Sequence, residues 1–159
     1  MKIIGDGGHA AVIRDLIQAV GSFYDEESIV IAVGDNRARK REAQTHGPAN
    51  YPKLIHPRAW VSPRAHVFEG AVIMAGAIVQ AEAFIGRFCI VNTGATVDHH
   101  CTVYDFAHIA PGAHLCGNVE VGEGALVGVG VGIAPGAKIP AWSIVKARRL
   151  EIESVPDNG

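Results

Sequence analysis

Cysteine, aromatic residues and long apolar runs are all scarce in this sequence of 159 residues. Its three cysteines, Cys89, Cys101 and Cys116, form no CxxC pair. An odd number of unpaired cysteines argues against a secreted disulfide framework and favours a reducing compartment. The longest apolar stretch, 125–137, is shorter than the ~20 residues that a membrane span needs. The apolar run at the N-terminus is too short for a signal peptide. These absences predict a cytoplasmic protein with no membrane partner.

Strong charge of one sign is also missing, because the formal net charge is only −2. The densest basic cluster consists of Arg37, Arg39, Lys40 and Arg41, and Glu42 follows it directly. Nucleic-acid-binding domains carry far denser basic patches. We therefore expect no nucleic-acid partner.

What the sequence does contain is an uninterrupted repeat of six residues. Every sixth position from residue 55 is aliphatic, and the position two before it is nearly always small. One inward β-branched side chain per hexad, with a small residue at each corner, is typical of a hexapeptide solenoid in which residues eighteen apart stack. The sixteen aliphatic positions are Ile55, Val61, Val67, Ile73, Val79, Ile85, Val91, Val97, Val103, Ile109, Leu115, Val121, Val127, Ile133, Ile139 and Val145. The pattern predicts a left-handed parallel β-helix of about five coils.

The first fifty residues follow a different pattern. A short apolar strand at 2–4 leads into a Gly-rich turn, and apolar residues then recur at helical spacing over 12–20. A second apolar run at 28–33 precedes a basic segment, 37–46, that ends at Gly47-Pro48. This order predicts a small Rossmann-like β-α-β-α unit. We expect three regions: a nucleotide-binding α/β domain at 1–50, the β-helix at 51–147 and a short tail at 148–159.

In such α/β units, phosphates approach bare backbone at the carboxyl ends of the strands. Gly7, Gly8 and Gly34 follow the two predicted strands and offer that kind of backbone. The turn does not match the GxGxxG dinucleotide fingerprint, so a nucleoside diphosphate fits better than NAD.

Five segments together resemble a known family. The chain is similar to the bacterial sugar acyltransferases of the NeuD/PglD type, which include the sialic-acid O-acetyltransferases and the UDP-4-amino-sugar N-acetyltransferases. The segments that carry the resemblance are GDGGHA (5–10), AVGDN (32–36), VNTGATVDHHC (91–101), DFAHI (105–109) and GNVEVG (117–122).

The resemblance implies an acetyl-CoA-dependent acetyltransferase, without a metal, that works as a homotrimer with its active sites between subunits. His99 is implied to be the general base that deprotonates an amine or hydroxyl of a sugar, with Asn92 and His100 beside it. The acetyl-CoA site is implied to include His108, Gly117, the backbone near Val129 and, at the phosphates, Lys146. The nucleotide end of the acceptor, expected to be UDP-linked, is implied to bind Gly7, Gly8, His9, Gly34 and Asp35.

The residues themselves support part of this assignment. His99 lies two residues after inward Val97, hence at a corner, and Gly117 stands one coil above it. A position without a side chain there leaves room for a thioester beside an imidazole whose ordinary pKa of ~6.5 suits a base. His100 departs from the amino-sugar branch of the family, which usually holds a carboxylate at this place.

Three alternatives stay open at this point. A sialic-acid-type O-acetyltransferase would use the same base. A catalytically impaired nucleotide-sugar-binding protein is suggested by His100 and by the short spacing between His9 and Gly34. A zinc-dependent hydratase of the carbonic-anhydrase type would need three converging histidines. His66, His108 and His114 precede inward residues on three different faces, which disfavours it.

Overall fold

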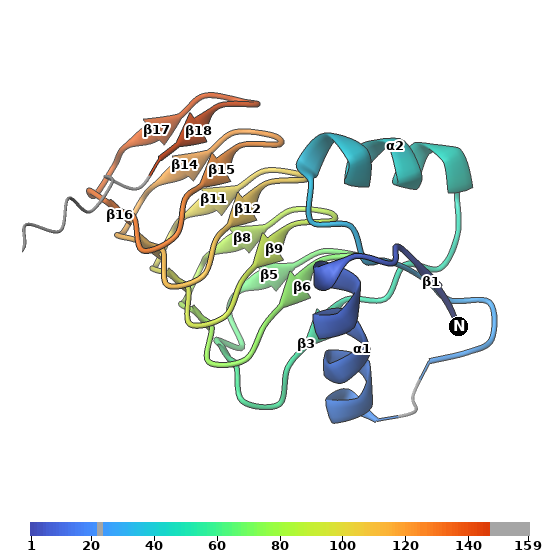
Figure 1. Ribbon diagram of the computed structural model, residues 1–159. Helices are drawn as coiled ribbons and strands as arrows, with labels where there is room; N and C mark the ends of the chain where they lie inside the picture. Colours follow the sequence, from blue (N-terminus) through green and yellow to red (C-terminus); the bar gives the residue numbers. More distant parts are fainter. Residues whose placement is uncertain (22–23, 147–159) are drawn as a thin grey trace, which may run out of the picture.

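The computed structural model describes residues 1–21 and 24–146, which form a small α/β unit followed by a β-solenoid (Figure 1). The α/β unit consists of β1 (Lys2–Ile4), α1 (Gly8–Val20), β2 (Ile29–Ile31) and α2 (Asn36–His46). Strands β1 and β2 pair in parallel, with Lys2 opposite Ile29. The predicted β-α-β-α order is confirmed. The second strand is shorter than the apolar run at 28–33, because only three of its residues pair with β1.

The predicted hexapeptide solenoid is confirmed as well. Three parallel sheets form its faces, in the orders β3-β6-β9-β12-β15-β18, β4-β7-β10-β13-β16 and β5-β8-β11-β14-β17. Paired residues are eighteen apart, as Thr96 and His114 illustrate. The strands are β3 (Leu54–Ile55), β4 (Trp60–Val61), β5 (His66–Val67), β6 (Val72–Ile73), β7 (Ile78–Val79), β8 (Phe84–Ile85), β9 (Ile90–Val91), β10 (Thr96–Val97), β11 (Thr102–Val103), β12 (His108–Ile109), β13 (His114–Leu115), β14 (Glu120–Val121), β15 (Leu126–Val127), β16 (Gly132–Ile133), β17 (Lys138–Ile139) and β18 (Ile144–Val145).

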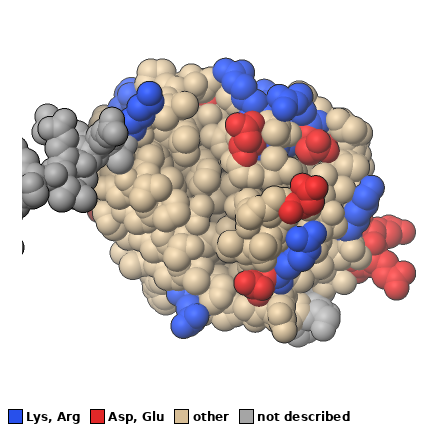
Figure 2. Space-filling view, viewed as in Figure 1, with Lys and Arg blue, Asp and Glu red and all other residues tan. Residues whose placement is uncertain are grey.

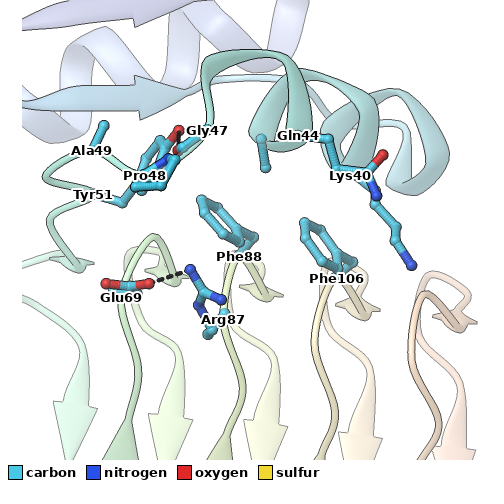
Figure 3. Close-up of a pocket in the computed structure, with 11 residues that line it drawn as sticks. Lys40, Gln44, Gly47, Pro48, Ala49, Tyr51, Glu69, Arg87, Phe88 and Phe106 are labelled. Carbon is cyan, nitrogen blue, oxygen red and sulfur yellow. Dashed lines mark hydrogen bonds and ion pairs between the residues drawn. The ribbon is translucent and has the colours of Figure 1, made fainter.

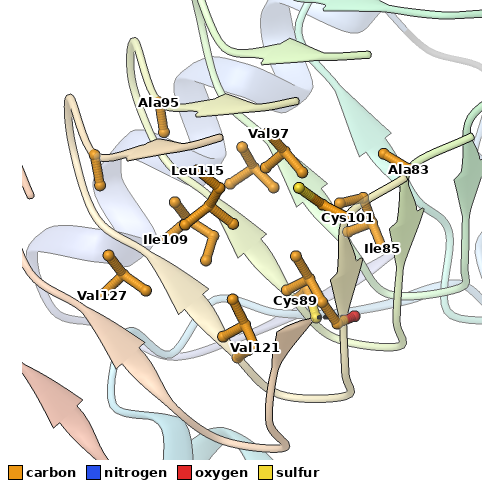
Figure 4. Packing of buried hydrophobic residues seen from close by; sticks show 14 of the residues in the cluster. Ala83, Ile85, Cys89, Ala95, Val97, Cys101, Ile109, Leu115, Val121 and Val127 are labelled. Atoms are coloured by element: carbon orange, nitrogen blue, oxygen red, sulfur yellow. Dashed lines mark hydrogen bonds between the residues drawn. The ribbon is translucent and has the colours of Figure 1, made fainter. Parts of the chain in front are cut away.

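The solenoid core consists of the predicted aliphatic positions and the small corner residues between them (Figure 4). Val91, Val97 and Ile109 are completely buried, whereas Ile55 and Val145 in the end coils are only partly covered. Cys89 and Cys101 lie in this core as free thiols. They therefore pack as small apolar residues. Among the described residues, none of the helices is long and apolar enough to cross a membrane, and the predicted tail at 148–159 lies outside the described part of the chain.

One corner of the solenoid carries a column of aromatic rings, which we call the aromatic corner. It consists of residues eighteen apart, namely Gly70, Phe88, Phe106, Gly124 and Trp142. Phe88 and Phe106 stack with their ring centroids 5.2 Å apart. The rings of Phe88 and Trp142 occupy the space that a side chain at Gly70 or Gly124 would fill. The aromatic residues adopt positive φ here, so the column combines strained backbone with close ring packing.

The α/β unit covers this corner and one neighbouring face. Helix α1 packs its apolar side against β3 and β6, where Leu16, Leu54 and Val72 belong to one buried cluster. Helix α2 lies along the aromatic corner (Figure 1). Asn36, its first residue, donates from Nδ2 to the carbonyls of Gly124 and Ala125 at 3.1 and 3.2 Å. The two units therefore share one continuous interior.

Arg39 of α2 fastens this contact. Its side chain is 2% exposed and donates five hydrogen bonds, none of them to a carboxylate. Two go to the aromatic corner, at 2.8 Å to the Phe88 carbonyl and 2.7 Å to the Phe106 carbonyl. Others reach the carbonyls of Val33 and Gly34 after β2. Burial lowers the pKa of Arg39 to about 10, so the guanidinium stays charged at neutral pH.

Replacing Arg39 by Met is expected to destabilise the protein by about 3 kcal/mol, because it leaves several buried carbonyls without donors. Equilibrium unfolding in urea measures this change. The matched control is Arg41→Met, an exposed position on the same helix, where a change of no more than about 0.5 kcal/mol is expected. Equal stability of the two variants would show that the Arg39 bonds contribute nothing net.

Candidate active site

The predicted site residues fall into two groups that lie on different parts of the solenoid. His99, His100 and Gly117 belong to the corner between β10 and β11 and its equivalent one coil above. Asn92 and His108 lie beside the loop after β2, which contains Gly34. Within one chain, Asn92 contacts His108 and Gly117 contacts His99, so the predicted catalytic residues and the predicted acetyl-CoA residues are each divided between the two groups.

The His99 imidazole packs directly on Gly117. A Cβ added at Gly117 would lie 2.5 Å from Cε1 and 2.8 Å from Nε2 of His99. Any side chain at this position would therefore displace the ring. On the other edge of the ring, Nδ1 lies 3.1 Å from Nδ1 of His100. The backbone N–H of His99 donates to Asp98 Oδ1 at 2.7 Å, which completes the turn.

The second group holds His108 in one protonation form. Asn92 Oδ1 accepts from the Thr93 N–H at 2.8 Å, so the amide nitrogen Nδ2 faces His108 Nε2 at 3.0 Å. An amide NH₂ can only donate, so Nε2 of His108 is the acceptor and its proton sits on Nδ1. The backbone of Gly34 in the α/β unit lies close to the ring. His108 is therefore a neutral imidazole that bridges the solenoid and the α/β unit.

Burial and positive charge keep two histidines of this group neutral. Burial, followed by the charges of Arg39 and His9, lowers the pKa of His108 to about 3. Burial and Arg39 likewise lower the pKa of His9 to about 4. His9 packs against Gly34, where an added Cβ would lie 3.4 Å from its own Cβ, and its Nε2 is buried without a hydrogen-bond partner in the described residues. Both rings are therefore neutral imidazoles at neutral pH.

A groove of about 140 Å³ opens beside His108. Its walls include the loop after β2, the outward residues of β15 and β18, and Trp142 of the aromatic corner. Gly34 and Asp35, which were predicted to bind the nucleotide end of the acceptor, also line it. Asp35 also has a structural use, because its carboxylate accepts from the Ala38 N–H at 2.7 Å and caps α2. Gly7 and Gly8, at the start of α1, have no other atom near the place of a Cβ, so their backbone is open to a ligand.

Two predicted residues lie apart from these groups. Val129 is 61% exposed in the turn after β15, and Lys146 is exposed after β18. The histidines that a zinc hydratase would need are on three different sheets, with His66 on β5, His108 on β12 and His114 on β13. No group of three metal-ligating side chains occurs in the part of the chain that the structure describes.

Sequence reasoning missed the roles of two residues. Arg39 counted only as a member of a basic cluster, yet it is buried and lowers the pKa of both His9 and His108. Trp142 lines the groove. Its spacing of eighteen from Gly124 was a usable signal. A separate hollow of about 470 Å³ lies between α2 and the stacked Phe88 and Phe106 (Figure 3), and none of the predicted site residues lines it.

The lowered histidine pKa values make stability depend on pH. In the unfolded chain both histidines become protonated below about pH 6.5. In the folded protein His9 is protonated only near pH 4 and His108 only near pH 3. The stabilisation is therefore complete above pH 6.5 and is lost as the pH falls. We expect His108→Gln to reduce the slope of unfolding free energy against pH by about 1.4 kcal/mol per pH unit near pH 5. Urea unfolding over pH 4.5–8.5 measures it. Between pH 7.5 and 8.5 both proteins should have the same slope, and an unchanged slope near pH 5 would contradict the prediction.

Comparisons with known proteins identify relatives by structure. No protein-family model matches the chain, and no curated protein matches it in sequence. The acetyltransferase domain of PglB from Neisseria gonorrhoeae FA1090 matches with a TM-score of 0.87 and 33% identity, over 98% of this chain and 92% of that one. PerB from Caulobacter crescentus, solved with CoA and GDP-perosamine, matches with a TM-score of 0.84 and 35% identity, over 98% and 90% of the two chains. WeeI from Acinetobacter baumannii AYE, at 16% identity and a TM-score of 0.62, shares the fold.

The first two relatives exceed 30% identity and are covered almost completely, which is enough to show common family membership. They also agree with the five sequence segments that predicted the same family. The chain therefore belongs to the hexapeptide β-solenoid family of sugar acetyltransferases, whose members PglB and PerB it resembles from end to end.

Proposed function

We propose that the protein transfers an acetyl group from acetyl-CoA to an amino group of a nucleotide-linked sugar, with His99 as general base. The observation that carries the proposal is the His99 imidazole held against Gly117, with one ring nitrogen engaged by His100. The relatives support the substrates. The PglB domain was solved with acetyl coenzyme A, and perosamine N-acetyltransferase with CoA and GDP-perosamine. Uridine, which the family resemblance implies, and guanosine, which the PerB complex contains, are both candidates for the nucleoside.

His99 has the contacts that a general base needs. When Nδ1 of His99 carries the proton and donates to Nδ1 of His100, Nε2 is left with a free lone pair. His99 then takes the proton that the amine loses as its nitrogen bonds to the thioester carbon and the carbon–sulfur bond breaks. The proton passes on to the departing sulfur. Direct attack of this kind needs no covalent bond to the enzyme.

His108 is unsuited to that proton transfer. Its pKa of about 3 keeps the ring neutral, and its Nε2 already accepts a hydrogen bond from Asn92. We assign His108 to the wall of the groove that holds the reacting groups, and Asn92 to the role of fixing the His108 ring. In this role a fixed neutral dipole is useful, because it orients a polar ligand without losing or gaining a proton.

The separation of the two groups favours an active site shared between subunits. His99 lies at the corner between β10 and β11, while the His108 groove belongs to the face formed by β12, β15 and β18. A homotrimer in which the His99 corner of one subunit faces the His108 groove of the next would complete the site, and rotational symmetry would repeat it three times.

Replacing His99 by Ala is expected to lower kcat by ~10² or more with little change in KM, which is the scale of lost general-base catalysis. Thiol release from acetyl-CoA measures it, with a panel of UDP- and GDP-linked amino sugars and sialic acids. The matched control is His46→Gln in α2, which should retain wild-type turnover. Turnover only with sialic acids would instead support the O-acetyltransferase alternative. Wild-type binding of nucleotide sugars without turnover would support the binding-protein alternative.

Gly117→Ala tests the role of His99 without replacing His99 itself. The new methyl group would lie 2.5 Å from Cε1 of His99, so the ring must move and kcat should fall nearly as far as in His99→Ala. Gly132→Ala is the control, because a Cβ there meets no atom within 4 Å. The double variant Gly117→Ala/His99→Ala should be no slower than His99→Ala alone. Additive losses would mean that Gly117 acts independently of His99.

A further inference from the structure

A surface hollow of about 300 Å³ adjoins the groove at His108. Arg37 and Trp142 line both spaces, so the hollow continues the groove from Gly34 and His108 onto the outer side of α2. Its other walls are Lys40, Arg41 and Gln44. A ligand with its reactive end beside His108 can therefore extend across Trp142 to α2.

The hollow is strongly positive because of the helical spacing of its residues. Positions 37, 40, 41 and 44 repeat at intervals of three and four, which places them on one side of α2, while Arg39 points into the protein interior. Lys and Arg side chains gather over α2 along the upper edge of the molecule in Figure 2, with acidic side chains beside them. Within residues 1–21 and 24–146, one carboxylate pairs with the basic side chains of the hollow. Oε1 of Glu123 lies 2.5 Å from Nζ of Lys40. Arg37 and Arg41 have no carboxylate partner in that part of the chain.

Arg37 is also held in position before any ligand binds. Its guanidinium carbon lies 4.8 Å from the centroid of the Trp142 ring, and Lys40 Nζ lies 5.1 Å from the same ring. Trp142 is in turn fixed by its packing over Gly124. A guanidinium stacked on an indole keeps its N–H edge free, and that edge matches the oxygens of a phosphate group. Arg37 therefore loses little conformational freedom when it binds an anion.

We propose that Arg37 and Arg41, with Trp142 as the platform for Arg37, bind the phosphate groups of a nucleotide whose reactive end occupies the His108 groove. The proposal rests on the proposed function, which supplies two phosphate-bearing ligands. One source is the nucleotide end of CoA, and the other is the diphosphate of the nucleotide sugar. Both present the same chemistry to the arginines, so binding measurements must distinguish them.

Isothermal titration of the full chain with CoA, dephospho-CoA, UDP and GDP provides the test. The variants are Arg37→Gln, Arg41→Gln and their combination. The control Lys53→Gln removes one positive charge, as each single variant does, at an exposed residue outside both spaces. We expect the double variant to bind CoA or the diphosphates at least tenfold more weakly than wild type, which is the scale of a lost charge-assisted contact. Arg37→Lys should recover only part of this loss, because an ammonium lacks the planar edge.

The pattern of losses identifies the source and separates the possible failures. A loss for CoA but not for dephospho-CoA assigns the subsite to the CoA 3′-phosphate, and a loss for UDP or GDP assigns it to the sugar nucleotide. Unchanged affinities in the double variant, when wild type binds, overturn the subsite and leave the proposed function intact. An equal loss in Lys53→Gln also overturns it, because net charge then explains the effect. If wild type binds none of the ligands, the proposed function fails and the subsite with it.

Discussion

The buried guanidinium of Arg39 sets the relation between the two units of this protein. A charge without a carboxylate partner is stable in the interior only if all its donors find acceptors. Here the acceptors include carbonyls from two successive coils, at Phe88 and Phe106, and from the loop after β2, at Gly34. Because that loop also forms a wall of the His108 groove, the contact that docks α2 on the solenoid also shapes the site.

The repeat of the solenoid imposes the second constraint. Residues eighteen apart stack in register throughout, so the character of one corner residue decides what the corner above can hold. At the aromatic corner, glycines at 70 and 124 admit the rings of Phe88 and Trp142. At the His99 corner, the glycine at 117 admits the imidazole. The regular backbone thus accommodates a large side chain at a corner by placing a glycine at the equivalent position of the neighbouring coil.

The surroundings of the histidines differ in burial and in neighbouring charge, although the side chains are chemically identical. His99 is exposed at a corner with one ring nitrogen on His100, whereas His9 and His108 are enclosed near Arg39. Burial, with the positive charge of Arg39 as a second cause, lowers the pKa of both enclosed rings. One arginine therefore contributes both to docking and to the electrostatics of the groove.

Much of the fold follows from the sequence because its signals are local and repeated. The period of six predicts the solenoid and its inward residues, and the contact between His99 and Gly117 follows from counting three hexads. The contacts between the two units have no such signal. Arg37, Arg39, Lys40 and Arg41 look alike in the sequence, yet Arg39 is buried while the other three line a surface hollow. The sequence by itself determined the family, the solenoid and the residues beside the candidate base. Only the tertiary structure decided which arginine is buried and which histidines are neutral, because these depend on docking contacts between segments distant in the chain.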